Sequence, residues 1–345
     1  MVPTTHKTGP WNLTDLKKIN PNGYKVITVF HCGGGSTMGY KLSGFNVLGG
    51  VEIDPKMMAI YKANHNPKHS FLMGIQNFNK IPRKDIPKEF FNIDVLDGSP
   101  PCSSFSMAGS RDKAWGKNKK FREGQAVQVL DDLFFHFIET ARILQPKIVV
   151  AENVKGLVTG KAKGYVKQIA QMFNHAGYDL QLFLLNSAFM GVPQRRERTF
   201  FIAKKKGLEL PKLRLQFDEK TISVKNAWSD LENQDAKSLS AFTRNLWNQA
   251  KPGENMSKYN NGNGFNNIKI ALNKPANTLP SSGGLYHNVE PRQLSDKEIL
   301  RIQTYPDDFN FKPLGARYIC GMSVPPYMMN RVSKQIELQW LNKLT

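Results

Sequence analysis

The sequence predicts an α/β fold, in which helices cover both faces of a doubly wound, mostly parallel sheet. Between about residues 25 and 205, short runs of β-branched or aromatic residues alternate with longer stretches whose apolar residues recur at helical spacing. A chain of 345 residues with 40% hydrophobic content is long enough for about two domains with a sizeable core. In folds of this class, ligands bind beyond the carboxyl ends of the strands.

Each expected strand is a short apolar run bounded by polar or turn residues. We expect strands at residues 25–31, 47–53, 91–96, 147–151, 179–185 and 198–203. The stretches between them carry the spacing of a helix with one buried face, and we expect helices at residues 55–64, 124–144 and 165–176.

The pattern changes after Lys204. Residues 206–290 are poorly periodic and rich in Asn, Lys, Ser and Gly, which predicts a second, smaller, loop-rich domain after a first domain at residues 20–205. Helical spacing returns at residues 294–304 and 329–344, so residues 291–345 are expected to return to the first domain.

Composition narrows the class of partner and the compartment. The formal net charge of +20 points to a polyanion. No apolar run approaches the length of a membrane span, and no apolar segment follows the first Lys as in a secretory signal, so we expect the protein to remain inside the cell. Three widely spaced cysteines support neither a disulfide framework nor a zinc site, and we expect no metal.

A glycine cluster follows the first expected strand, in the sequence VFHCGGGSTMG at residues 29–39. Such a turn allows the backbone to approach a nucleotide-like ligand closely. Met38 breaks the GxGxxG spacing, which weakens a dinucleotide interpretation. Glu52 ends the second strand and can accept hydrogen bonds from two ribose hydroxyls, whereas Asp54 suits a helix cap. These residues predict an adenosine-bearing cofactor without a pyrophosphate.

Reactive side chains follow the next expected strands. Cys102 comes after two prolines that stiffen its backbone, and a basic segment at residues 106–124 follows it, which favours a thiolate and attracts phosphate. Glu152 and Asn153 follow a buried run, where a partly desolvated carboxyl can act as an acid. Arg196 and Arg198 alternate in extended chain, so we expect them to share one face of a cleft.

In this order, these elements resemble the DNA cytosine carbon-5 methyltransferases of bacteria and phages. The resemblance covers nearly the whole chain. The resemblance rests on these motifs: the glycine turn at 30–39, Glu52, the Pro–Cys pair at 101–102, Glu-Asn-Val at 152–154, QxRxR at 194–198, RQLSDKE at 292–298 and GMSV at 321–324. The resemblance implies a Rossmann-like methyltransferase fold, duplex DNA as substrate and S-adenosylmethionine as cofactor. It assigns cofactor contacts to Phe30, Gly34, Gly35, Glu52, Ile53, Gln76, Pro101, Ser323 and Val324.

The same resemblance implies catalytic roles. Cys102 would add to carbon 6 of a flipped-out cytosine, and Glu152 would hold ring nitrogen 3 and the amino group. Arg198 would contact the carbonyl oxygen of the base, and Arg196 the backbone or the catalytic loop. Asn153 would brace the Pro–Cys turn. Residues 206–290 would read base edges in the major groove, with KPANTL at 274–279 as a family element.

Three residues depart from the pattern of that family. Cys32 stands where its first glycine is usual, Ile75 where an Asp is expected after Gly74, and Met322 where GNSV has Asn. These departures bear on cofactor affinity.

Two alternatives stay open: a tRNA cytosine-5 methyltransferase of the same family, and a catalytically silent DNA-binding regulator on this fold. An NAD-dependent enzyme would leave Cys102 unexplained. We expect a monomer in the cytoplasm of a prokaryote, associated with the nucleoid, with a cognate restriction endonuclease as a candidate partner and no membrane association.

Overall fold

The computed structural model describes residues 9–101, 132–159, 163–232, 234–264 and 266–344, with the short strands β5 (Asn118–Lys119) and β6 (Gln128–Val129) between them. Cys102 lies outside the described residues, as do most of the basic segment at 106–124 and the first part of the helix predicted at 124–144.

The chain divides into two compact units, each built from separate stretches of sequence. One comprises residues 19–186, 197–216 and 329–345, and we call it the sheet unit. The other comprises residues 1–18, 187–196 and 217–328, and we call it the loop-rich unit. These units differ from the predicted boundaries, because residues 291–328 stay with the loop-rich unit and only the last helix returns to the sheet unit.

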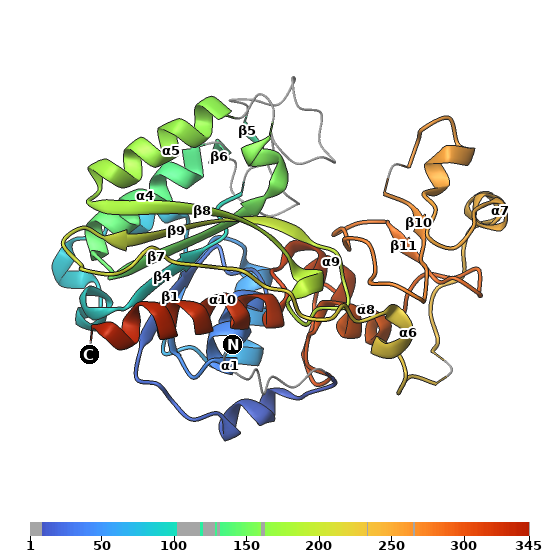
Figure 1. The fold of residues 1–345 in the computed structure, drawn as a ribbon, viewed down its shortest axis with the longest axis horizontal. Coiled ribbons are helices and arrows are strands. Elements are labelled where there is room, and N and C mark those ends of the chain that lie inside the picture. The colour runs from blue at the N-terminus through green and yellow to red at the C-terminus, as the bar shows by residue number, and fades with distance from the viewer. Residues whose placement is uncertain are drawn as a thin grey trace. The chain divides into compact units, whose positions relative to one another are not determined.

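The sheet unit is built on a seven-stranded sheet with the order β3-β2-β1-β4-β7-β9-β8 (Figure 1). Only β9 runs antiparallel to its neighbours, so the predicted mostly parallel α/β fold is confirmed. Strand order reverses beside β1, which leaves the carboxyl ends of β1 and β4 next to each other. The strands are β1 (Lys25–Val29), β2 (Asn46–Glu52), β3 (His69–Leu72), β4 (Val95–Gly98), β7 (Ile148–Val154), β8 (Tyr178–Asn186) and β9 (Glu197–Lys205).

Two strand predictions need correction. The strand expected at residues 91–96 begins only at Val95, because Pro87 starts a 3-10 helix, Lys88–Asn92, that buries Phe90 in the core. Strand β3 was not predicted, since its four residues are only partly buried and carry no alternation.

Helices flank the sheet on both faces, with α4 (Leu133–Leu144) and α5 (Lys163–His175) on one and α1 (Gly35–Leu42) on the other (Figure 1). Asp54 caps α2 (Pro55–His65) by accepting hydrogen bonds from the backbone N–H groups of Lys56 and Met57, as the sequence predicted. The remaining helices are α3 (Ile75–Phe78), α6 (Val224–Ala227), α7 (Ala241–Gln249), α8 (Asp296–Gln303), α9 (Ala316–Met322) and α10 (Pro326–Gln339).

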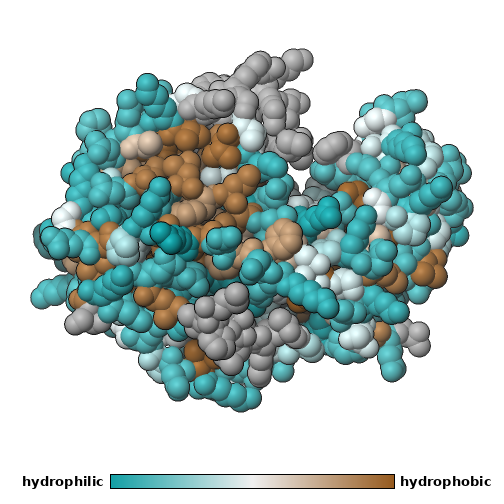
Figure 2. All heavy atoms as spheres, in the orientation of Figure 1, coloured by the Kyte–Doolittle hydropathy of each residue, from teal (hydrophilic) through white to brown (hydrophobic). Residues whose placement is uncertain are grey.

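Strand β8 forms one edge of the sheet and exposes apolar side chains. Leu182 is 41% and Leu184 48% exposed, and Figure 2 shows apolar residues gathered on the face where β8 lies. Among the described helices, none combines the length and the apolar character that a membrane crossing requires.

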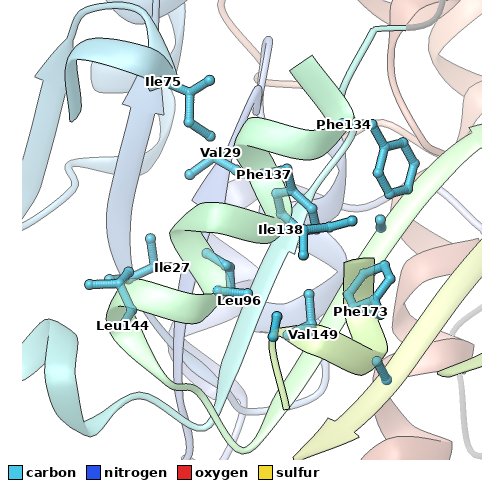
Figure 3. Close-up of a cluster of buried hydrophobic side chains, with 14 of the residues drawn as sticks. Ile27, Val29, Ile75, Leu96, Phe134, Phe137, Ile138, Leu144, Val149 and Phe173 are labelled. Atoms are coloured by element: carbon cyan, nitrogen blue, oxygen red, sulfur yellow. The ribbon is translucent and has the colours of Figure 1, made fainter. Parts of the chain in front are cut away.

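The main core lies between the sheet and α4 and α5. Figure 3 shows Ile27, Val29 and Leu96 of the strands packed against Phe137 and Ile138 of α4. Burial of such side chains contributes about 1.5–3 kcal/mol each. This core holds the ends of β1, β4 and β7 in fixed register, which positions the residues that follow them.

The loop-rich unit has its own small core. It contains Leu239, Leu246, Trp247, Ala250, Met256 and Tyr286. The ammonium group of Lys269 lies 3.6 Å from the centre of the Trp247 ring and donates to the Trp247 carbonyl oxygen. The short strands β10 (Ile268–Lys269) and β11 (Leu285–Tyr286) pair next to it.

Candidate active site

The glycine turn between β1 and α1 is folded tightly. Phe30 and Cys32 have φ angles of 53° and 48°, and Gly34 has 87°. A Cβ atom at Gly34 would lie 2.2 Å from Nε2 of His65, so only glycine fits there. The cysteine that replaces the first glycine of the family pattern therefore occupies a backbone conformation that favours glycine.

The Glu52 carboxylate lies against this turn. One oxygen accepts a hydrogen bond from the backbone N–H of Cys32 at 3.1 Å, and the other accepts from that of Asp54 at 3.0 Å. Burial raises the pKa of Glu52 to about 7, although the backbone N–H groups of Asp54, Cys32 and Ile53 favour the charged form.

A small apolar pocket opens beside Glu52. It is lined by Val29, Phe30, Val51, Ile53, Met73, Gly74 and Ile75. Its walls come from the ends of β1 and β2 and from the start of α3, so segments far apart in the sequence meet here. Apolar walls beside a buried carboxylate suit an apolar ring attached to a ribose.

The predicted cofactor residues distribute unevenly around this pocket. Phe30 and Ile53 line it, and Gly34 and Gly35 form the adjoining turn. The side-chain oxygen of Gln76 lies beside Gly74. Pro101 ends the described stretch after β4.

Ser323 and Val324 belong to the loop-rich unit. There both are buried, and the Ser323 hydroxyl donates to the carbonyl oxygen of Ile319 at 2.8 Å. Their expected role in closing the cofactor pocket stays a prediction.

Glu152 and Arg198 form a buried ion pair at the end of β7. Nε of Arg198 lies 2.9 Å from Oε1 of Glu152, and the two side chains are 13% and 11% exposed. Burial lowers the pKa of the Arg198 guanidinium, while the Glu152 carboxylate favours its charged form. A carboxylate held in this way presents its second oxygen in a fixed direction.

Asn153 connects β7 to the segment that leads toward Cys102. Its side-chain amide donates to the carbonyl oxygen of Pro100 at 2.9 Å, and its oxygen accepts from the backbone N–H of Val154. Asn153 thereby holds the backbone just before Pro101.

Arg196 does not accompany Arg198. It is 2% exposed, and it donates to the carbonyl oxygens of Leu279 and Gly321 at 3.1 and 2.9 Å within the loop-rich unit. Strand β9 begins only at Glu197, so the alternation expected for an extended chain does not reach Arg196. The shared face predicted for the two arginines is absent, and Arg196 binds backbone instead.

Sequence reasoning missed a chain of buried amides in the loop-rich unit. Gln194 donates to Gln303 at 2.6 Å, and Gln303 donates to the carbonyl oxygen of Ser323 at 3.0 Å. The Gln194 oxygen also accepts from the backbone N–H of Leu279. The QxRxR pattern contained Gln194, but no local signal identifies its partner 109 residues away.

Sequence reasoning also missed Asp97 at the end of β4. It is 3% exposed and accepts a hydrogen bond from the hydroxyl group of Tyr40. The signal that could have found it is a carboxyl inside an otherwise apolar run, because buried charges are costly and rarely kept without a role.

Comparison with known proteins gives consistent matches. The family model for C-5 cytosine-specific DNA methylases matches residues 24–338. The Type II methyltransferase M.NgoPII of Neisseria gonorrhoeae is 29% identical over 320 residues, which cover 84% of this chain and 87% of that protein. The Type II methyltransferase M1.HphI of Haemophilus parahaemolyticus is 28% identical and covers 90% and 86%.

A solved structure has the same fold. It is described as a DNA modification methyltransferase encoded within an Escherichia coli prophage, and it aligns with a TM-score of 0.73 at 21% identity. The alignment covers 93% of this chain and 100% of that one.

Proposed function

The chain belongs to the C-5 cytosine-specific DNA methylases, and from this membership we propose that it transfers a methyl group from S-adenosylmethionine to carbon 5 of cytosine in duplex DNA. The observation that carries the proposal is the buried Glu152–Arg198 pair, which adjoins the Asn153 contact to Pro100. This arrangement supports a binding place for a polar, planar base next to the predicted nucleophile.

Carbon 5 of cytosine is a poor nucleophile, so the ring must first be activated covalently. The Cys102 thiolate adds to carbon 6, and Glu152 binds nitrogen 3 and stabilises the proton that the ring gains there. Arg198 contacts the carbonyl oxygen of the base and keeps Glu152 aligned. After methyl transfer, loss of the carbon-5 proton and elimination of the thiolate restore the aromatic ring.

The cofactor would lie in the apolar pocket beside Glu52. S-adenosylmethionine supplies an electrophilic methyl group on its sulfonium centre. Phe30 and Ile53 would hold the adenine ring, the Glu52 carboxylate would accept from the ribose hydroxyls, and the turn at Gly34 and Gly35 would allow close backbone approach. Gln76 and Pro101 would lie at the same end of the sheet.

Duplex DNA hides carbon 6 within the base stack, so the target cytosine must be flipped out, at a cost of a few kcal/mol. Residues 206–290 act as the target-recognition domain, and Arg196 supports it from within by binding the Leu279 carbonyl. The protein acts as a monomer, on nucleoid-associated DNA in the cytoplasm. The Type II names of its relatives support a role in DNA modification together with a cognate restriction endonuclease.

Covalent trapping tests the proposal. Duplex DNA containing 5-fluorocytosine should form a denaturation-resistant adduct when S-adenosylmethionine is present, because fluorine cannot leave carbon 5 as a proton does. Cys102→Ser should abolish the adduct, and Glu152→Gln should slow its formation by about a hundredfold. Exposed Lys343→Ala, outside residues 206–290, is the matched control and should form it normally.

The outcomes separate the alternatives. No adduct across a random-sequence duplex library contradicts the enzyme proposal and favours a silent DNA-binding regulator. Transfer to tRNA but not to DNA favours the tRNA enzyme. Bisulfite sequencing of DNA from cells that express the protein then gives the recognition sequence.

A further inference from the structure

We propose that Asp97 is a positioning residue for methyl transfer, which ties helix α1, behind the glycine turn, to the strand end that leads to Pro101 and Cys102. This inference rests on the proposed function. Its first support is placement, because β4 lies between β1 and β7 and ends one residue after Asp97. Asp97 thus lies midway between the turn assigned to the cofactor and the Glu152–Arg198 pair.

The contacts of Asp97 reach helix α1. The hydroxyl group of Tyr40, itself fully buried, donates to Oδ1 of Asp97 at 3.3 Å, and the Ser36 side chain supplies a second hydrogen bond. Ser36 lies in the first turn of α1, directly after Gly35. A shift of the Asp97 carboxyl therefore acts on the helix that begins at the cofactor turn.

The register of the sheet directs Asp97 toward Glu152. Asp97 pairs with Val150 on β7, and side chains two residues apart on a strand share a face. Glu152 follows on that face, and its charge disfavours ionisation of Asp97. The charge of each carboxyl therefore affects the ionisation of the other, near the carboxyl ends of β4 and β7.

The chemistry of the surroundings requires Asp97 to be uncharged at neutral pH. Burial and, to a smaller extent, the charge of Glu152 raise the pKa of Asp97 to about 8, although the hydrogen bonds from Tyr40 and Ser36 lower it. The described titratable groups that interact with it are Tyr40 on α1, Tyr61 on α2 and Glu152 on β7. An ionised Asp97 would repel Glu152, for which Arg198 is the ion-pair partner.

The activity test compares Asp97→Leu with Asp97→Asn. Leucine removes the hydrogen-bonding group and should lower kcat at pH 7 by about tenfold, with KM for S-adenosylmethionine and DNA changed less than about threefold, since small misplacements reduce the chemical step. Asparagine keeps the shape and the acceptor and should restore most of kcat. The matched control is Asp94→Leu, just before β4, where the carboxylate pairs with Lys147.

The pH profile distinguishes positioning from mere packing. In the wild-type protein kcat should fall above about pH 8 as Asp97 ionises, and Asp97→Asn should abolish that fall. Tyr40→Phe removes a hydrogen bond that favours the charged form, so it should move the fall to higher pH. An unchanged alkaline fall in Asp97→Asn, or equal loss of kcat in Asp97→Leu and Asp94→Leu, would overturn the proposal.

A measurement without turnover separates this inference from the function itself. Because the folded-state pKa of Asp97 is raised, its contribution to stability is present below about pH 4 and is lost as pH rises through about 8. The Tm of the wild-type protein should therefore decline relative to Asp97→Asn between about pH 4 and 8, and the difference should level off above that range. A pH-independent difference overturns the role of Asp97, whereas absent adduct formation by the wild-type protein overturns the proposed function instead.

Discussion

At the residue scale, the cofactor turn combines unfavourable backbone angles with a hydrogen bond to a buried carboxylate. Phe30 and Cys32 have left-handed backbone angles, at a cost of about 1 kcal/mol each. The backbone N–H of Cys32 donates to the Glu52 carboxylate, and that of Phe30 to the Val51 carbonyl oxygen. The turn thus orients a buried carboxylate through a conformation that most side chains disfavour.

Substitution of Cys32 tests this strain. Cys32→Val should lower the free energy of unfolding by about 1–2 kcal/mol, because a β-branched residue tolerates a positive φ poorly. Cys32→Gly relieves the same strain but loosens the unfolded chain, so it should change stability by less than about 1 kcal/mol. Urea unfolding measures both. Equal effects of valine and glycine would show that the backbone angle is not the cause.

Glu52 predicts a pH-dependent cofactor affinity. Its pKa of about 7 means that the carboxylate, which can accept from two ribose hydroxyls, becomes populated as pH rises through 7. The Kd for S-adenosylmethionine should therefore decrease by severalfold between about pH 6 and 8. Calorimetric titration checks this.

Glu52→Gln is the matched control, because it should bind more weakly and without that pH dependence. The same raised pKa makes Glu52 reduce stability as pH rises from about 4.5 to 7, so Tm should decline more steeply in that interval in the wild-type protein than in Glu52→Gln. A flat wild-type Kd profile would contradict the assigned role of Glu52.

At the scale of elements, α8 shows most clearly how a sequence motif determines where a helix begins. The Ser295 hydroxyl accepts from the backbone N–H of Glu298, and the Glu298 carboxylate accepts from that of Ser295, which makes a capping box. Arg292 binds both carboxylate oxygens of Glu298 at 2.8 Å. The RQLSDKE motif thus fixes the start of one helix through a buried charge pair.

Loss of that pair should be costly. Arg292→Met leaves Glu298 buried without its main cation and should lower the free energy of unfolding by about 3 kcal/mol. Lys297→Ala, an exposed neighbour on the same helix, should change it by less than about 0.5 kcal/mol. Chemical denaturation gives both values, and a small effect for Arg292→Met would mean that the capping box alone holds α8.

At the scale of the whole molecule, charge dominates. The net charge of the full sequence is +20, and hydrophilic residues cover much of the face shown in Figure 2. For a protein that binds duplex DNA, such charge makes phosphate contact the main source of affinity and speeds encounter.

DNA affinity should therefore depend steeply on salt. With about six to ten phosphate contacts, the Kd should rise by about a thousandfold or more between 50 and 200 mM salt. Fluorescence anisotropy with a labelled duplex measures this, and an uncharged nucleic-acid analogue of the same sequence is the control. If the Kd hardly changes with salt, the basic residues make few contacts with DNA phosphates, and their charge serves another partner.

The sequence by itself determined the fold class, most strands and helices, and the family, because these depend on local periodicity and on motifs that chemistry ties to particular residue types. The Asp54 helix cap could also be predicted from the sequence, since its partners lie two and three residues away. The late start of β4 was not, because Phe90 is drawn into the core by contacts across the fold.

Only the tertiary structure decided what the buried polar groups do. Arg196 and Arg198 are only two residues apart in one motif. Arg196 nevertheless binds carbonyl oxygens more than 80 residues away, whereas Arg198 pairs with Glu152. The raised pKa values of Glu52 and Asp97 likewise follow from burial by distant segments. Desolvation and long-range hydrogen bonds arise when the chain is folded, and no local pattern encodes them.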